Sequence, residues 1–168
     1  MSQDRPLVDD RAPADAIAEM VEHVLALAET WTAWDGEPLR VGDRIYTPHK
    51  AIRRVGDHMV DHLAQLEAHL ANEAPLPDRW HGSLITTEMD MAPFTTDDLD
   101  EARSRLSRLA QIWAMRIRSV PEEELDRSMG EAYTPREMAF CAVGSVYYAD
   151  GVGSLQPTLQ SPTEIAPR

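Results

Sequence analysis

The chain has a single cysteine, Cys141, among its 168 residues, so no disulfide can form within it. It has no apolar run approaching the roughly 20 residues that a membrane-spanning helix needs, and we expect no membrane partner. The first segment, MSQDRPLVDDRAP, is polar, mixed in charge and without an apolar signal core, so we expect a cytoplasmic protein.

Basic residues are also scarce, because 16 Lys and Arg face 29 Asp and Glu, for a net charge of −13. Such a surface repels a nucleic-acid backbone, so we expect no nucleic-acid partner. The sequence contains no Gly-rich phosphate loop, no Ser-His-Asp set with an elbow motif and no zinc-finger spacing. These absences exclude several common classes of site and direct attention to the helices.

What the sequence does contain is a set of amphipathic helices, which predicts an all-α fold. Apolar residues make up 43% of the chain, and its length fits one domain with a sizeable core. We expect a flexible N-terminal arm over residues 1–12, a helical domain over 13–153 and a C-terminal extension over 154–168.

The clearest helix runs from about Pro48 to Asn72, with Thr47 as its cap and Pro48 in the first turn. Apolar residues recur along it at spacings of three and four. Further helices are predicted over about 13–34, from Thr95 or Thr96 to just before Pro121, and over 133–153. A turn-rich connector over 35–46 and a long connection over 73–96 separate the first three helices, and connections as long as the second are often lids or binding loops.

Two histidines four residues apart, His58 and His62, lie on one side of the second helix. This spacing suits a shared metal ion, and either histidine could instead act as a general acid or base. The structural alternative is a hydrogen-bonded His62 at the core edge and a partly exposed His58. A third ligand for zinc could come from one of four residues: His23, His81, Asp57 or Asp61.

Two further candidates lie outside that pair. Trp80 and His81 are adjacent in the long connection, where His81 is either a site residue or a surface histidine. Cys141 lies between Phe140 and Ala142 and is either a nucleophile with a lowered pKa or a buried, inert thiol.

The second and fourth helices open with the same tripeptide, Tyr46-Thr47-Pro48 and Tyr133-Thr134-Pro135. Over about residues 13–153 the chain resembles the DinB-like superfamily. The resemblance rests on these two caps, on the order of the helices, on the VGD motif at 55–57 and on Asp150-Gly151 at the end of the fourth helix. This superfamily includes YfiT-type metal-dependent hydrolases and thiol S-transferases that use bacillithiol or mycothiol. The resemblance implies an up-down-down-up four-helix bundle, often paired as a homodimer.

The resemblance also implies a divalent metal held by three histidines, and here the sequence departs from the pattern. Counted from the two caps, the three positions fall on Arg54, Ser145 and Ala149. Arginine is a cation and alanine has no ligand atom, so we expect no metal at this site. The alternative cofactors are zinc or nickel at His58 and His62, and a low-molecular-weight thiol.

We therefore expect a bundle cavity with an altered lining. Arg54, Asp57, Ser145, Tyr147, Trp80 and His81 are the candidate ligand-binding residues, and His58, His62 and Tyr148 are the candidate catalytic ones. Arg54 either holds a carboxylate or phosphate or pairs with Asp57 or Asp150 to keep the helices in register.

Three functions follow from these residues. The first is a DinB-like protein that has lost its metal and binds or transforms a small, anionic or thiol-conjugated molecule. The second is a hydrolase or thiol S-transferase with a metal relocated to His58 and His62. The third is a non-enzymatic, self-associating protein anchored by Trp34, Trp113 or the aromatic residues of the long connection.

Overall fold

The computed structural model describes residues 5–76, 82–130 and 132–156. These residues are mostly helical, as the all-α prediction expects. The α-helices are α1 (Pro13–Ala28), α2 (Pro48–Leu70), α3 (Thr96–Arg118), α4 (Glu122–Leu125), α5 (Pro135–Gly144) and α6 (Tyr147–Val152). Two short strands, β1 (Leu39–Val41) and β2 (Arg44–Tyr46), pair antiparallel, and single 3-10 turns occupy Trp31–Ala33 and Met89–Met91.

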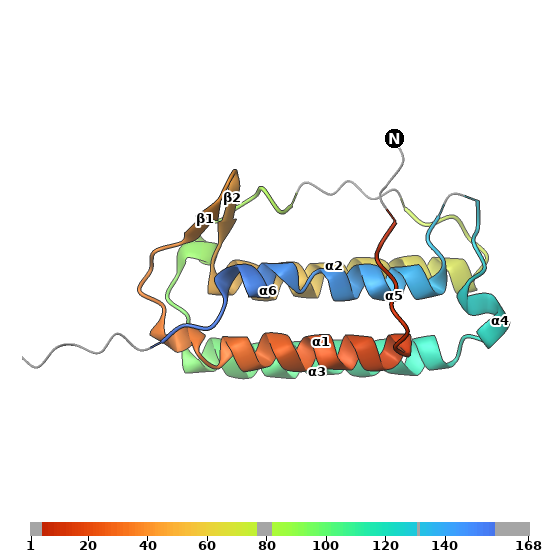
Figure 1. Ribbon diagram of the computed structural model, residues 1–168, viewed down its shortest axis with the longest axis horizontal. Helices are drawn as coiled ribbons and strands as arrows, with labels where there is room; N and C mark the ends of the chain where they lie inside the picture. Colours follow the sequence, from red (N-terminus) through yellow and green to blue (C-terminus); the bar gives the residue numbers. More distant parts are fainter. Residues whose placement is uncertain (1–4, 77–81, 131, 157–168) are drawn as a thin grey trace, which may run out of the picture.

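The long helices form two layers (Figure 1). One layer is α1 against α3, and the other is α2 beside α5 and α6. Both α2 and α3 begin at the end of the molecule where the β-hairpin lies, whereas α1 and the α5–α6 pair begin at the opposite end. The DinB-like topology itself stays a prediction.

Side chains capping the helix starts fix where the long helices begin. The Thr47 hydroxyl accepts from the backbone N–H of Lys50 at the start of α2. At α3, Thr95 and Asp98 form a reciprocal capping box, and Thr134 and Glu137 do the same at α5. Each box satisfies two backbone donors that would otherwise lack a partner, and Thr47 satisfies one at α2. The predicted starts of α2 and α3 are confirmed.

One prediction in the first third of the chain was wrong, and another was incomplete. The first helix ends at Ala28 rather than near Trp34, because residues 31–33 turn more tightly as a 3-10 helix. The turn-rich connector contains the β-hairpin, with Leu39 paired to Tyr46. Gly42 makes the turn between the strands at φ 58°, a backbone conformation that favours glycine.

The fourth predicted helix is not continuous, which corrects the single helix expected over 133–153. It breaks after Gly144, and α6 begins at Tyr147. The Ser145 hydroxyl donates to the Ala142 carbonyl oxygen at 2.6 Å. Glycine followed by a serine that hydrogen-bonds its own backbone is a weak helix sequence, and the chain tightens here before continuing.

Trp113, predicted as a possible anchor for self-association, is fully buried. Its indole Nε1 donates to the Met59 carbonyl oxygen at 2.9 Å, which ties α3 to α2. It therefore belongs to the core and cannot contact a second copy. Homodimer formation stays a prediction.

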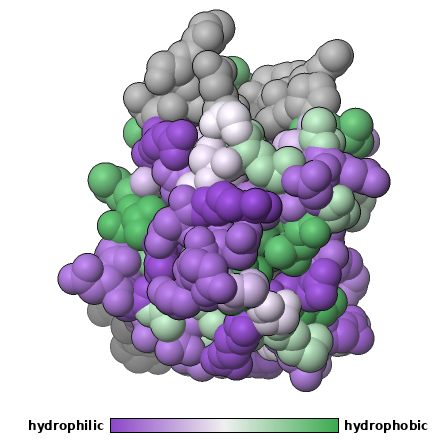
Figure 2. Space-filling model, turned by 90° about the vertical axis from the view of Figure 1, so that its right-hand side faces the viewer, coloured by the Kyte–Doolittle hydropathy of each residue, from purple (hydrophilic) through white to green (hydrophobic). Residues whose placement is uncertain are grey.

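The surface at the α4 end of the molecule is mixed rather than apolar. In Figure 2, hydrophilic residues occupy much of this face and hydrophobic ones form separate patches. Within residues 5–76, 82–130 and 132–156, no helix combines the length and hydrophobicity needed to cross a bilayer.

Candidate functional site

Five polar side chains form a continuous row between α2 and the α5–α6 side of the molecule. Arg54, His58 and His62 lie at successive spacings of four on α2, so they share one helix face. Tyr133, just before α5, and Tyr148, on α6, contact them from the opposite side. We call these five residues the polar row.

Arg54 occupies the hairpin end of the polar row and is only 4% exposed. Its Nη1 lies 3.1 Å from Asp57 Oδ2, and its Nε donates to Tyr148 Oη at 3.4 Å. The guanidinium carbon lies 5.5 Å from the centre of the Tyr148 ring, within reach of a cation–π interaction. Arg54 thus joins α2 to α6, in the manner of the structural interpretation considered from the sequence.

The long connection closes over Arg54 at Gly82. A Cβ added to Gly82 would lie 2.3 Å from Arg54 Nη1, so a side chain at this position would displace the guanidinium. Glycine allows the backbone to approach the cation closely. An anionic ligand could therefore reach Arg54 only after this backbone or Asp57 moved.

His58 and His62 stack at the middle of the polar row. Their ring centres are 5.9 Å apart with an interplanar angle of 21°. His62 is 1% exposed, and its Nδ1 lies 2.9 Å from Gln65 Oε1. Burial, together with His62 and Arg54, lowers the pKa of His58 from an ordinary 6.5 to about 3. His58 is therefore a neutral imidazole near pH 7, able to donate or accept a hydrogen bond.

Tyr147 and Ser145, both predicted to line the site, lie beside the polar row. The Tyr147 and Tyr148 ring centres are 4.0 Å apart, and the Arg44 guanidinium carbon lies 5.4 Å from the centre of the Tyr147 ring. Burial raises the pKa of Tyr147, so the side chain stays a neutral phenol at physiological pH. Ser145 is 1% exposed and its hydroxyl is engaged by Ala142, so it offers little to a ligand.

The residues at the three positions where the resemblance predicts metal ligands do not fit a metal ion. Arg54 is buried as a cation bonded to Asp57 and Tyr148. Ala149 is fully buried and has no donor atom. In the described ranges, no cluster of three His, Cys, Asp or Glu residues could hold a metal elsewhere.

A cavity of about 420 Å³ adjoins the polar row at His58. Its wall is mostly apolar and is built by the N-terminal arm on one side and α5 with the start of α6 on the other. The lining residues are Pro6, Leu7, Asp9, Arg11, His58, Phe140, Cys141, Val143, Gly144, Ser145, Val146 and Tyr147. A cavity of this size suits a small organic molecule.

Gly144 leaves this cavity open on the α5 side. A Cβ added to Gly144 would meet no heavy atom within 4 Å. Gly144 is also exposed, so a larger side chain can be introduced at this edge of the cavity without a clash.

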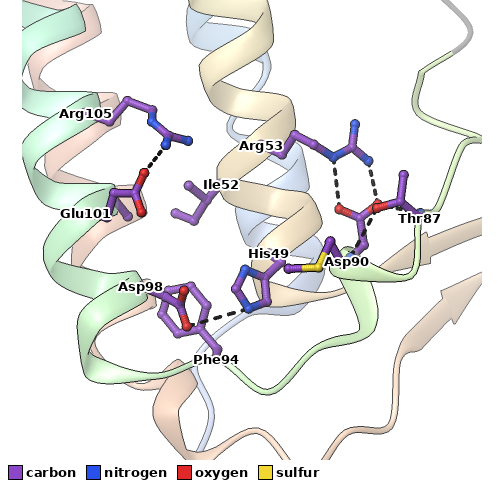
Figure 3. Close-up of a pocket in the computed structure, with 11 residues that line it drawn as sticks. His49, Ile52, Arg53, Thr87, Asp90, Phe94, Asp98, Glu101 and Arg105 are labelled. Atoms are coloured by element: carbon purple, nitrogen blue, oxygen red, sulfur yellow. Dashed lines mark hydrogen bonds and ion pairs between the residues drawn. The ribbon is translucent and has the colours of Figure 1, made fainter.

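A second, smaller cavity of about 190 Å³ lies between α2, α3 and the 3-10 turn at 89–91 (Figure 3). On one wall Arg53 holds the 2%-exposed Asp90 through two hydrogen bonds of 2.9 and 2.6 Å. On the other wall Arg105 pairs with Glu101. The charged groups named here are paired with each other. The Arg53–Asp90 pair therefore anchors the long connection to α2, and we do not assign this cavity as the binding site.

The sequence-based candidates are brought together only in part. Arg54, Asp57, His58, His62 and Tyr148 lie in or against the polar row, with Tyr147 stacked behind it. Trp80 and His81 lie outside the described residues.

Sequence reasoning missed the polar residues that fasten the long connection to α2. Lys50 is 1% exposed, its Nζ donates to Ser83 O and Thr86 Oγ1, and burial lowers its pKa. Asp90 accepts from Arg53 and from the Thr87 N–H. The available signal was a lysine three residues after the cap and four residues before Arg54, on the same face of α2 as the polar row.

Comparisons of the chain with protein-family models, with curated proteins and with solved structures give no match. The DinB-like resemblance thus stays a prediction from the sequence.

Proposed function

We propose that this chain binds a small organic molecule in the 420 Å³ cavity beside His58, as a DinB-like protein without the metal site of that superfamily. The observation that carries the proposal is the position of His58. It is the one member of the polar row that lines the cavity in the described part of the chain. The cavity therefore combines an apolar volume with a partly buried hydrogen-bonding group, the combination that small-molecule sites use.

The polar row supports His58 in this role. His62 stacks on it, and the centre of the Tyr148 ring lies 5.8 Å from that of His58. These contacts fix the imidazole plane, so a ligand meets a hydrogen-bonding group already in position. Catalytic roles for His58, His62 and Tyr148 stay predictions.

The absence of the superfamily's metal site follows, in this proposal, from the side chains at the three positions. Arg54 there carries a positive charge, which would repel a cation. In its place Arg54 links Asp57 with Tyr148, and so holds α2 against α6.

The test uses Gly144→Leu, because the new side chain fills the cavity while its Cβ meets open space. A panel of small molecules is screened for thermal stabilisation of the natural protein, since a ligand that binds only the folded state raises Tm. We expect the stabilising compounds to lose their effect on Gly144→Leu. Ser107→Leu, which adds the same side chain at an exposed position of α3, is the matched control and should keep the effect. Equal stabilisation of Gly144→Leu and the natural protein would contradict the proposal.

A second candidate, a relocated zinc or nickel site, is favoured by the stacked imidazoles of His58 and His62. His58 is neutral near pH 7, the state in which histidine binds a metal. Elemental analysis of protein made without a histidine tag decides it. About one metal per chain, lost in His58→Ala/His62→Ala, would replace the metal-free proposal with this one.

A further inference from the structure

The N-terminal arm, residues 5–11, is fastened on both sides of the cavity by ion pairs. At one end, Arg5 Nη1 lies 2.6 and 2.7 Å from the two carboxylate oxygens of Glu137, at the start of α5. At the other end, Arg11 Nη1 lies 2.7 Å from Glu19 Oε2 on α1. Figure 1 shows this segment crossing α5 on its way to the start of α1.

Between these two ion pairs the arm carries apolar side chains that are left in solvent. Leu7 is 96% exposed and Val8 is 42% exposed, although Leu7 stands at the edge of a mostly apolar cavity. Moving an exposed leucine side chain against an apolar surface is favourable because it removes apolar area from water. The arm therefore spans the cavity with Leu7 turned out to solvent, and a movement of Leu7 into the cavity mouth would bury apolar surface.

The ion pairs permit such a movement because they are weak. The Arg5 side chain is 53% exposed against 14% for its partner Glu137, and those of Arg11 and Glu19 are 42% and 57% exposed. Exposed ion pairs contribute little to stability, so they can position the arm without locking it.

We propose that residues 5–11 are a lid, and that it closes with Leu7 over an uncharged, mostly apolar molecule hydrogen-bonded to His58. This inference rests on the proposed function, for which it names the ligand class and the route of entry.

The ligand class follows from the cavity wall. Its apolar members are Pro6, Leu7, Phe140, Val143, Gly144 and Val146. Its charged members, Asp9 and Arg11, hydrogen-bond to each other, so they already neutralise one another. An unbalanced charge on the ligand would find no partner in this wall and would lose its hydration on entry.

Cys141 reports on the lid without any ligand, because it lines the cavity beneath the arm and is the only cysteine in the chain. Its rate of reaction with a maleimide is measured on the full-length natural protein, on Arg5→Gln and on Arg103→Gln. Arg5→Gln releases the arm from Glu137 and should raise the rate severalfold. Arg103→Gln removes another surface arginine's ion pair, far from the arm, and should leave the rate unchanged. A rate for Arg5→Gln equal to that of the natural protein would overturn the lid.

Two matched dyes test the ligand class. N-phenyl-1-naphthylamine is uncharged, and 8-anilinonaphthalene-1-sulfonate differs mainly by its anionic group. We expect the uncharged dye to bind at least tenfold more tightly, to lower the Cys141 rate and to bind severalfold more weakly to Leu7→Ser. Tighter binding of the sulfonate would overturn the uncharged class, and equal affinity for Leu7→Ser would overturn the contact with Leu7.

The two proposals fail in different ways. Dye binding that survives Gly144→Leu counts against the proposed function, whatever Cys141 reports. If Arg5→Gln leaves the rate of reaction of Cys141 with maleimide unchanged, the result counts against the lid alone, even where the dye binds in the cavity.

Discussion

The two layers of this molecule bury different kinds of residue. The buried residues of α1 and α3 are all apolar, from Pro13 to Ala28 in one helix and from Leu99 to Ile117 in the other. Helix α2 buries Lys50, Arg54, His62 and His69 among its apolar residues. Burying ionisable groups costs free energy unless they are paired. Helix α2 therefore bears a desolvation cost that α1 and α3, which bury only apolar residues, do not.

This difference separates the residues that stabilise the fold from those that could serve a function. The α1–α3 layer needs nothing beyond apolar burial, and its ion pairs stay at the surface. Three of the five polar-row residues belong to α2, and the 420 Å³ cavity adjoins the row at His58. Strained or costly groups of this kind concentrate at functional sites.

The largest loss of stability is expected from Trp113→Ala, which removes a buried side chain from the apolar layer formed by α1 and α3. Trp113 is fully buried on α3 and donates to the Met59 carbonyl oxygen. Removing the indole leaves a cavity and an orphaned acceptor, and should lower the free energy of unfolding by about 4 kcal/mol. Urea unfolding measures it, and a loss under about 1 kcal/mol would show that the apolar layer is not the main source of stability.

Asp90→Ala should come next, because it breaks the buried pair that fastens the connection to α2. Asp90 is 2% exposed and accepts from Arg53 and Thr87. Burial alone would raise the pKa of Asp90, and the bonds from Arg53 and Thr87 hold it below its ordinary value. Removing one partner of such a pair costs about 3 kcal/mol by urea unfolding. Asp97→Ala, at an exposed position, is the control, and equal losses in the two variants would refute the anchoring role.

Acid should weaken the polar layer through His58. Its pKa is about 3 in the folded chain against an ordinary 6.5, so between these values the unfolded state binds the proton more tightly. Stability is therefore full above pH 6.5 and falls as the pH is lowered, by about 2 kcal/mol at pH 5. The groups facing His58 are His62 and Arg54 on its own helix and Tyr148 on α6.

Urea unfolding at pH 7 and pH 5 tests whether the free energy of unfolding falls as the pH is lowered. His58→Gln should lose markedly less stability between the two pH values than the natural protein, whereas His23→Gln, changed at an exposed position, should lose as much. The same pH dependence in all three chains would contradict the assignment to His58.

The smallest effect is expected from Arg103→Gln, which removes the ion pair with Glu29 between α3 and α1. Both side chains are largely exposed. Solvent screens such pairs, so the midpoint of urea unfolding should not change measurably. A clear loss would mean that surface charges, and not apolar burial alone, hold this layer together.

Much of the fold could be predicted from local signals. Thr47, Thr95 and Thr134 each stand before a helix and cap it, so the starts of α2 and α3 followed from single residues. The β-hairpin was missed because its strands have only three residues each, too short to show alternation. The break after Gly144 was missed because apolar residues continue through it and conceal the change of helix.

The site could be predicted less well. The i,i+4 spacing placed Arg54, His58 and His62 on one face, since helix geometry alone fixes that relation. The involvement of Tyr133 with His62 and of Gly82 with Arg54 depends on contacts between distant segments, which no local pattern contains. The cavity depends on the path of an arm with no helix or strand, and so it had no sequence signal at all.

The most direct test of the account is to map where a small molecule binds by NMR, using ¹⁵N-labelled protein titrated with N-phenyl-1-naphthylamine. We expect chemical-shift changes centred on residues 140–147, on His58 and on the arm, with little change along the contact between α1 and α3. Changes centred on the apolar layer or on the cavity of Figure 3, or none at saturating dye, would contradict the assignment of binding to the polar layer.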